Sequence, residues 1–167
     1  MSKTCIVPYD TTETKLLTKP QQLDNLVYIV DSLMNSGLPN ITYNVAFAIA
    51  GNISAESSFN PTADNKKSGA YGLCQWYQKR ETNLINFCKE NNLSYTEREG
   101  QLKFLVNELK NGYKSVYSTI TNMNDNIDDM AYTFCMKFEV PGEQYCKKRP
   151  GYARECAKKY KEIKGQP

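Results

Sequence analysis

The stretch VAFAIAGNISAESSFNP, residues 45–61, carries the most apolar helical pattern in the chain. Its first part, Val45 to Ala50, is apolar on almost every helical face, which is typical of a helix enclosed by the core. Pro39 and Asn40 precede this run, and Ser58 follows it just before a polar segment. The sequence therefore predicts a buried central helix over residues 39–58.

Amphipathic segments surround this predicted helix. Apolar residues recur at i, i+3, i+4 and i+7 in the segments 19–36, 77–90, 96–112, 124–138 and 152–163. The pairs Thr18 with Gln21 and Thr96 with Glu99 form capping-box patterns at two of the helix starts. Residues 60–75 hold a proline, two glycines and several Asn, Asp and Ser residues, so we expect an irregular or β-hairpin insertion there. The predicted fold class is mainly α.

Composition indicates one folded domain and restricts its chemistry. The 167 residues, 40% of them hydrophobic, are enough for one substantial core, which we assign to residues 19–164 after an N-terminal arm of residues 1–18. The chain contains no histidine, which excludes a Ser-His-Asp or Cys-His pair and a His-ligated zinc within it. Acid-base chemistry must come from carboxylates, tyrosine, lysine or cysteine.

The cysteines leave two alternatives open. The six are Cys5, Cys74, Cys88, Cys135, Cys146 and Cys156. They include no C-x-x-C pair, so neither a thioredoxin-type redox pair nor a zinc ribbon is indicated. We expect most of them to be small buried hydrophobic residues. The alternative is a disulfide bridge between two of the last three.

The sequence shows no targeting or membrane-spanning pattern. The first twenty residues contain no apolar run like a signal-peptide core. The longest apolar stretch, Val45 to Ala50, is far short of the ~20 residues that cross a bilayer. We therefore expect a protein that is made in the cytoplasm without a signal peptide and has no membrane partner. If it works outside the cell, we expect something other than its own leader to deliver it.

The C-terminal segment, residues 147–164, is strongly basic. It carries eight basic and two acidic side chains, a net charge of +6, which leaves −3 for the rest of the chain. Such a surface suits long-range attraction to anionic wall polymers, and the alternative is an ordinary solvated helix face. No pattern here matches a nucleic-acid-binding module, so no nucleic-acid partner is expected.

Glu56 is the unusual residue of the central segment. It follows Ile53 by three positions and Ile49 by seven, which places it on an apolar stripe at the C-terminal end of the predicted helix. Partial desolvation and the negative end of the helix dipole both favour a protonated carboxyl group, as a general acid requires. The alternative is an ordinary helix-end acid that is solvated or paired with Lys66 or Lys67.

Two motifs surround Glu56 in the sequence. Residues 51–61 read GNISAESSFNP, residues 68–76 read SGAYGLCQW, and Arg80 follows. This ordered set resembles the phage tail lysozymes of the lysozyme-like superfamily, with a looser similarity to goose-type lysozymes and lytic transglycosylases. The resemblance extends over residues 41–157 through Gln101-Leu102-x-Phe104-Leu105, Glu108-Leu109 and Phe138-Glu139-x-Pro141. It implies a lysozyme-like single domain.

The resemblance also implies an activity. Phage tail lysozymes cleave the β-1,4 bond between N-acetylmuramic acid and N-acetylglucosamine in peptidoglycan, and Glu56 matches their catalytic acid. The acid protonates the glycosidic oxygen as oxocarbenium-like charge develops, and no metal or organic cofactor is needed. A hydrolase needs a second group, for which Asp64 and Glu139 are candidates. A lytic transglycosylase needs none, because the substrate's 6-hydroxyl attacks; we favour hydrolysis.

The motifs also supply candidate saccharide-binding residues. These are Ser57, Asn60, Tyr71, Gln75 and Trp76, which offer ring faces and hydrogen-bonding groups for a sugar. For Trp76, a position in the core is an equal alternative. For Glu139, we favour a role as anchor for a cation such as Arg80 or Arg149, because a buried carboxylate usually needs a cationic partner.

The expected partners follow from this resemblance. They are bacterial peptidoglycan and other phage tail proteins, and the expected place of action is the virion tail or the host wall and periplasm. A different class of function remains as the runner-up, a saccharide-binding module on the same scaffold without turnover.

Overall fold

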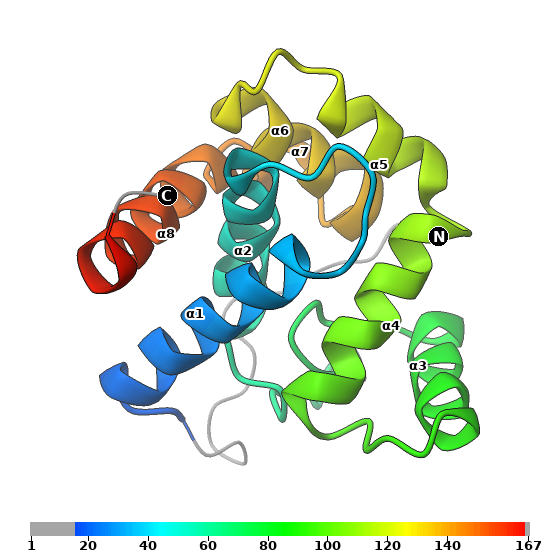
Figure 1. Ribbon diagram of the computed structural model, residues 1–167. Coiled ribbons are helices and arrows are strands. Elements are labelled where there is room, and N and C mark those ends of the chain that lie inside the picture. Colours follow the sequence, from blue (N-terminus) through cyan, green and yellow to red (C-terminus); the bar gives the residue numbers. More distant parts are fainter. Residues whose placement is uncertain (1–15, 166–167) are drawn as a thin grey trace.

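The computed structural model describes residues 16–165, and they form a mainly α-helical fold (Figure 1). The predicted fold class is confirmed. Helix α2 (Tyr43–Ser57) is the buried centre, with every residue from Val45 to Ile53 buried. It begins later than predicted, because Asn40 has a left-handed φ of 58° and Thr42 caps the helix by accepting a hydrogen bond from the Val45 amide.

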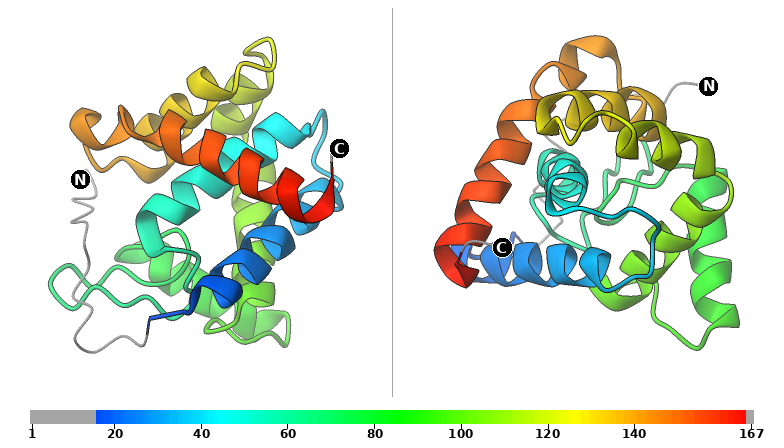
Figure 2. Two further views of the ribbon diagram at one scale, coloured as in Figure 1. Left: turned by 90° about the vertical axis from the view of Figure 1, so that its left-hand side faces the viewer. Right: turned by 45° about the horizontal axis from the view of Figure 1, so that its top comes forward.

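Three helices pack directly on α2. They are α1 (Lys19–Met34), α6 (Ile127–Phe134) and α8 (Arg149–Lys164). Figure 2 shows α2 nearly end-on in its right-hand view, with these helices around it. Thr18 and Gln21 form the predicted capping box at the start of α1, with reciprocal side-chain to backbone bonds of 3.3 and 2.9 Å.

The closest packing between α2 and α8 occurs at Gly51. A Cβ atom on Gly51 would lie 2.5 Å from the backbone nitrogen and 2.6 Å from the Cα of Ala153. Both atoms belong to the backbone of α8, so the contact cannot be relieved by turning a side chain. Glycine at this position therefore lets the central helix meet α8 face to face.

We expect Gly51→Ala to lower the free energy of unfolding by about 1–3 kcal/mol, the usual cost of overpacking a core. Urea denaturation followed by circular dichroism measures this change. The matched control is Gly151→Ala on α8, where an added Cβ meets nothing within 4 Å. Equal stabilities of the two variants would contradict the packing argument.

A second group of helices extends beyond the centre. It contains α3 (Lys79–Glu90), α4 (Arg98–Lys110) and α5 (Lys114–Thr121), and α4 also contacts α1. The predicted Thr96–Glu99 capping box is wrong. The Thr96 hydroxyl lies 2.7 Å from that of Ser94, and α4 begins after Glu97 without a side-chain cap.

The predicted helix over residues 124–138 is divided in the structure. Asn126 caps α6, and a π-helical turn, η1 (Cys135–Glu139), continues it. The short helix α7 (Glu143–Cys146) and then α8 follow, α8 starting at Arg149 rather than at 152. Among residues 16–165, no helix combines the length and apolarity needed to span a membrane.

The predicted insertion is an irregular, hairpin-like loop between α2 and α3. Tyr71 pairs with Trp76 through two backbone bonds of 2.9 Å, and isolated bridges join Asp64 to Tyr71 and Tyr71 to Trp76. Gln101 on α4 holds the loop by accepting from the Leu73 amide at 2.9 Å and donating to the Pro61 carbonyl at 2.7 Å. The loop is thus fixed to α4 beside the end of α2.

Candidate active site

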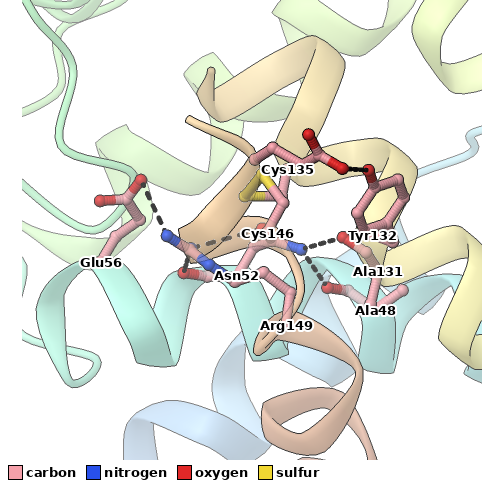
Figure 3. The surroundings of a disulfide bond; sticks show 9 residues. Ala48, Asn52, Glu56, Ala131, Tyr132, Cys135, Cys146 and Arg149 are labelled. Carbon is pink, nitrogen blue, oxygen red and sulfur yellow. Dashed lines mark hydrogen bonds and ion pairs between the residues drawn. A yellow bond between two sulfur atoms is a disulfide. The ribbon is translucent and has the colours of Figure 1, made fainter. Parts of the chain in front are cut away.

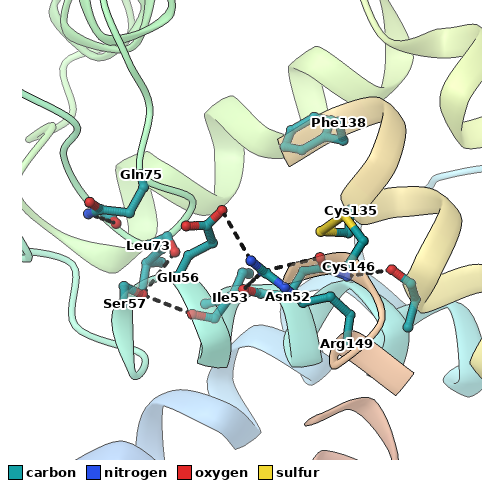
Figure 4. A network of polar contacts seen from close by, with 12 residues as sticks. Asn52, Ile53, Glu56, Ser57, Leu73, Gln75, Cys135, Phe138, Cys146 and Arg149 are labelled. Atoms are coloured by element: carbon teal, nitrogen blue, oxygen red, sulfur yellow. Dashed lines mark hydrogen bonds and ion pairs between the residues drawn. A yellow bond between two sulfur atoms is a disulfide. The ribbon is translucent and has the colours of Figure 1, made fainter. Parts of the chain in front are cut away.

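Glu56 lies in the last turn of α2 and is 1% exposed. The helix ends just beyond it, because Ser58 and Phe59 both adopt left-handed φ angles. Its Oε1 lies 3.8 Å from Nη2 of Arg149, the first residue of α8, whose side chain is also buried. In Figure 4 the carboxylate lies between the loop that carries Leu73 and Gln75 and the guanidinium group of Arg149.

Arg149 is held by further contacts with α2. Its Nη1 donates to the carbonyl and side-chain oxygens of Asn52 at 3.2 and 3.4 Å. The side-chain amide nitrogen of Asn52 in turn donates to the carbonyls of Ala48 on α2 and Ala131 on α6. These bonds connect α2, α6 and α8 and fix the guanidinium group beside the carboxylate of Glu56.

The partner of Glu56 differs from the lysine alternative considered from the sequence. Lys66 forms an ion pair with Asp64 at 3.0 Å, and Glu56 is buried rather than solvated. Burying a charge of either sign in protein is costly, and a partner of opposite charge offsets that cost. The structure therefore pairs two buried ionisable groups at the end of the central helix.

A disulfide bond lies close to Arg149 in the sequence. Cys135 in η1 is bonded to Cys146 in α7, with Cα atoms 5.3 Å apart, and both residues are fully buried (Figure 3). This confirms the alternative of a bridge between two of the last three cysteines. The bridge closes the segment that carries Glu139 and ends three residues before Arg149.

The remaining cysteines are consistent with the prediction of buried residues where the structure describes them. Cys74, Cys88 and Cys156 are buried. Burial raises the pKa of the Cys156 thiol to about 12 and also raises that of Cys88. Cys5, like most of the predicted N-terminal arm, lies outside the described residues.

We expect the double variant Cys135→Ala/Cys146→Ala to lose about 2–4 kcal/mol of unfolding free energy, because the bridge restricts the unfolded chain. Urea denaturation with and without dithiothreitol measures the loss. Reduction should destabilise the native protein and leave the double variant unchanged. If dithiothreitol shifted both proteins equally, the bridge would not be the cause.

Glu139 is fully buried at the end of η1, next to Val140 with its left-handed φ of 52°. The carbonyl of Phe138 accepts a hydrogen bond of 2.8 Å from Nη1 of Arg80. Burial opposes the charge on Arg80, but the carboxylates of Glu108 and then Glu139 outweigh it and raise the pKa of the guanidinium group. The charge of Glu139 thus acts on Arg80.

The direct partner of Arg80 is Glu108, to which the sequence alone assigned no role. Arg80 binds the two oxygens of Glu108 through Nε at 2.9 Å and Nη2 at 3.1 Å. Oε1 of Glu108 also accepts from the indole nitrogen of Trp76 at 2.8 Å. Glu108 is an acidic residue on the apolar face of α4. This pattern is the sequence signal that could have identified Glu108 as a partner of Arg80.

The other candidate carboxylate, Asp64, lies in the loop with its side chain 34% exposed. It faces Tyr71 across an isolated bridge. Burial, then the nearby Tyr95, Asp64 and Glu81, raise the pKa of Tyr71 to about 12. Burial and the charge of Asp64 also raise the pKa of Glu81 on α3. Glu81, which the sequence analysis did not identify, is therefore a second carboxylate whose charge interacts with that of Asp64.

Most of the candidate saccharide-binding residues have structural contacts. The Ser57 hydroxyl lies 2.8 Å from the carbonyl oxygen of Leu73 and 3.1 Å from that of Ile53, and the side-chain oxygen of Asn60 accepts from the amide and hydroxyl of Thr62. The Gln75 amide donates to the Ala63 and Gly72 carbonyls. These three side chains are buried and hold the loop against the end of α2.

The two aromatic candidates differ in exposure. Trp76 is 1% exposed and packs edge-on against Phe104, which corresponds to the core alternative. Tyr71 is half-buried and contacts the ring of Tyr95, with centroids 5.6 Å apart. Of the candidate site residues, Tyr71 and Asp64 therefore have side chains that are accessible to a bound molecule.

This arrangement can support acid-base chemistry by carboxylates. It combines the buried carboxyl group of Glu56 beside a cation with a partly exposed carboxylate, Asp64, and a half-buried tyrosine, Tyr71, on the adjoining loop. Within residues 16–165, no group of three or more cysteine, aspartate or glutamate side chains is arranged to hold a metal ion.

Comparison with known proteins adds one finding. A family model described as phage tail lysozyme matches residues 24–160, which includes α2, the loop and most of α8. A comparison with curated proteins finds no match.

Proposed function

The chain belongs to the phage tail lysozyme family, whose members are lysozyme-like enzymes that degrade peptidoglycan, and from this we propose a specific reaction. The protein cleaves the β-1,4 bond between N-acetylmuramic acid and N-acetylglucosamine, with Glu56 as the general acid. The observation that carries the proposal is the buried carboxyl group of Glu56 at the end of α2, within 3.8 Å of Arg149.

The proposed proton transfer uses both members of this pair. Glu56 protonates the glycosidic oxygen as the bond to the sugar breaks and positive charge develops on the ring. Glu56 is left as a buried carboxylate, which the guanidinium group of Arg149 stabilises. Arg149 is therefore a positioning residue, because it acts on the reaction through Glu56.

We propose Asp64 as the group that activates water in a hydrolytic mechanism. Its side chain is 34% exposed, so water can reach it, whereas Glu139 is fully buried and its charge acts on Arg80. Glu139 then has a positioning role for Arg80 and the η1 segment. Transglycosylation, in which the substrate's 6-hydroxyl attacks, is the alternative outcome.

The family also supports a place of action. We propose a bacteriolytic enzyme that is carried by the phage tail and acts on the cell wall, with other tail proteins as partners. The lysozyme-like domain of this proposal comprises residues 19–164, with residues 1–18 as an arm.

Product analysis tests the proposal. Purified peptidoglycan is incubated with the protein, and the soluble fragments are analysed by mass spectrometry before and after borohydride reduction. We expect muropeptides with reducing N-acetylmuramic acid ends. Anhydro ends would instead identify a transglycosylase and remove the role of Asp64, while binding without release of fragments would contradict enzymatic function.

A further inference from the structure

A groove between α3 and α4 lies outside the Glu56 site. Its volume is about 610 Å³, within the range of about 300–1,000 Å³ that is usual for small-molecule sites. The two helices lie side by side in Figure 1 and are in direct contact. One wall belongs to α3 and the other to α4 and the residues that follow it.

The lining combines side-chain amides with an aromatic surface. Asn83 and Asn86 lie on α3, Asn107 lies on α4, and the half-buried Phe87 also lines the groove. Among the hydrogen bonds of the described residues, none involves the exposed side chains of Asn83 and Asn86. Their amides can each donate and accept, and a ring face suits the apolar side of a pyranose.

Arg80 connects the lining of the groove to the η1 segment. Arg80 and Tyr113 both line the groove, and the guanidinium group of Arg80 lies 4.4 Å from the centre of the Tyr113 ring. Arg80 also contacts the Phe138 ring at 4.3 Å and donates to its carbonyl, immediately before Glu139. Arg80 thus joins the wall of the groove to the buried segment that carries Glu139.

The chemistry of the lining selects a neutral sugar as the ligand. The charged side chains of the lining balance in sign, because Arg80 binds the two oxygens of Glu108 and the exposed Lys79 and Glu90 carry opposite charges. Amide groups complement the acetamido and hydroxyl groups of an N-acetylated hexosamine. We infer that the α3–α4 groove binds an N-acetylhexosamine unit of the glycan strand at a distance from the cleaved bond. This inference rests on the proposed function and names a further binding site for its substrate.

Binding of N-acetylglucosamine oligomers tests the inference directly. The Glu56→Gln variant is titrated with the tetrasaccharide and followed by backbone amide NMR shifts, so that cleavage does not interfere. We expect shifts at residues 83–87 and 107. Introducing Asn83→Ala and Asn86→Ala into the Glu56→Gln variant should raise the Kd for the tetrasaccharide about tenfold, which is the expected effect of losing two modest hydrogen bonds. The control Asn122→Ala, an exposed amide at the end of α5, should have no effect.

A kinetic measurement complements the titration in the otherwise native enzyme. Asn83→Ala/Asn86→Ala should raise KM for solubilised glycan strands about tenfold and leave kcat unchanged. Unchanged KM and no shifts at the groove would overturn the inference while leaving the proposed function intact. Shifts caused by an isolated stem peptide, and not by the sugar, would also overturn it. If the native protein released no muropeptides but the oligomer still bound the groove, only the proposed reaction would fail.

Discussion

Replacing Glu56 with glutamine is expected to reduce the release of muropeptides from purified peptidoglycan by about 10²–10⁴-fold, the usual contribution of a general acid. Glutamine has nearly the same shape as glutamate but cannot donate a proton to the leaving oxygen. The measurement is the initial rate of release, quantified by mass spectrometry.

Two controls separate this effect from a loss of folding. Circular dichroism and urea denaturation show whether Glu56→Gln remains folded, since its amide oxygen can still face Arg149. The variant Lys67→Gln alters an exposed charge of the same loop and should keep the native rate. A Glu56→Gln variant that retained a tenth or more of the native rate would contradict the assignment of Glu56 as the acid.

Replacing Arg149 with methionine is expected to lower the free energy of unfolding by about 3–5 kcal/mol, because it removes the guanidinium group that lies beside the buried carboxyl group of Glu56. Both side chains are almost completely buried, and Nη2 of Arg149 lies 3.8 Å from Oε1 of Glu56. The bonds from Arg149 to Asn52 are lost as well. Urea denaturation at neutral pH measures the difference.

The matched control is Arg154→Met on the same helix. Arg154 pairs with Asp128 at 2.6 Å, but its side chain is 58% exposed, so the pair is worth at most about 1 kcal/mol. The double variant Glu56→Gln/Arg149→Met should recover part of the loss, because the carboxylate is then absent. If Arg149→Met and Arg154→Met were equally stable, the buried pair would not support the fold.

Much of the fold could be predicted because its signals lie in short segments. The apolar run of α2 and the capping box of α1 depend on residues within a few turns of one another. The same local reasoning was wrong at Thr96, whose hydroxyl contacts Ser94 instead of capping α4. It also missed α5, and it placed the start of α8 three residues too late, although Pro150 in the first turn was a local signal.

Within the candidate site, the local sequence pattern predicted where Glu56 lies on its helix but not which groups it contacts. Glu56 was placed correctly on a buried stripe at the end of the central helix. Its partner was not identified, nor was Glu108 as the direct partner of Arg80. The basic segment 147–164 proved to be partly neutralised, since Arg154, Lys159 and Lys164 each form ion pairs with nearby acids.

The sequence by itself determined the mainly helical architecture, the family motifs and the position of Glu56, because helix period, caps and motif spacing are properties of neighbouring residues. Only the tertiary structure decided that Arg149 lies beside Glu56, that Cys135 is bonded to Cys146, and that Trp76 is enclosed by the core. Such contacts join distant segments, as the sequence separation of 97 between Asn52 and Arg149 illustrates. They depend on how α2, α6 and α8 pack, which no local pattern encodes.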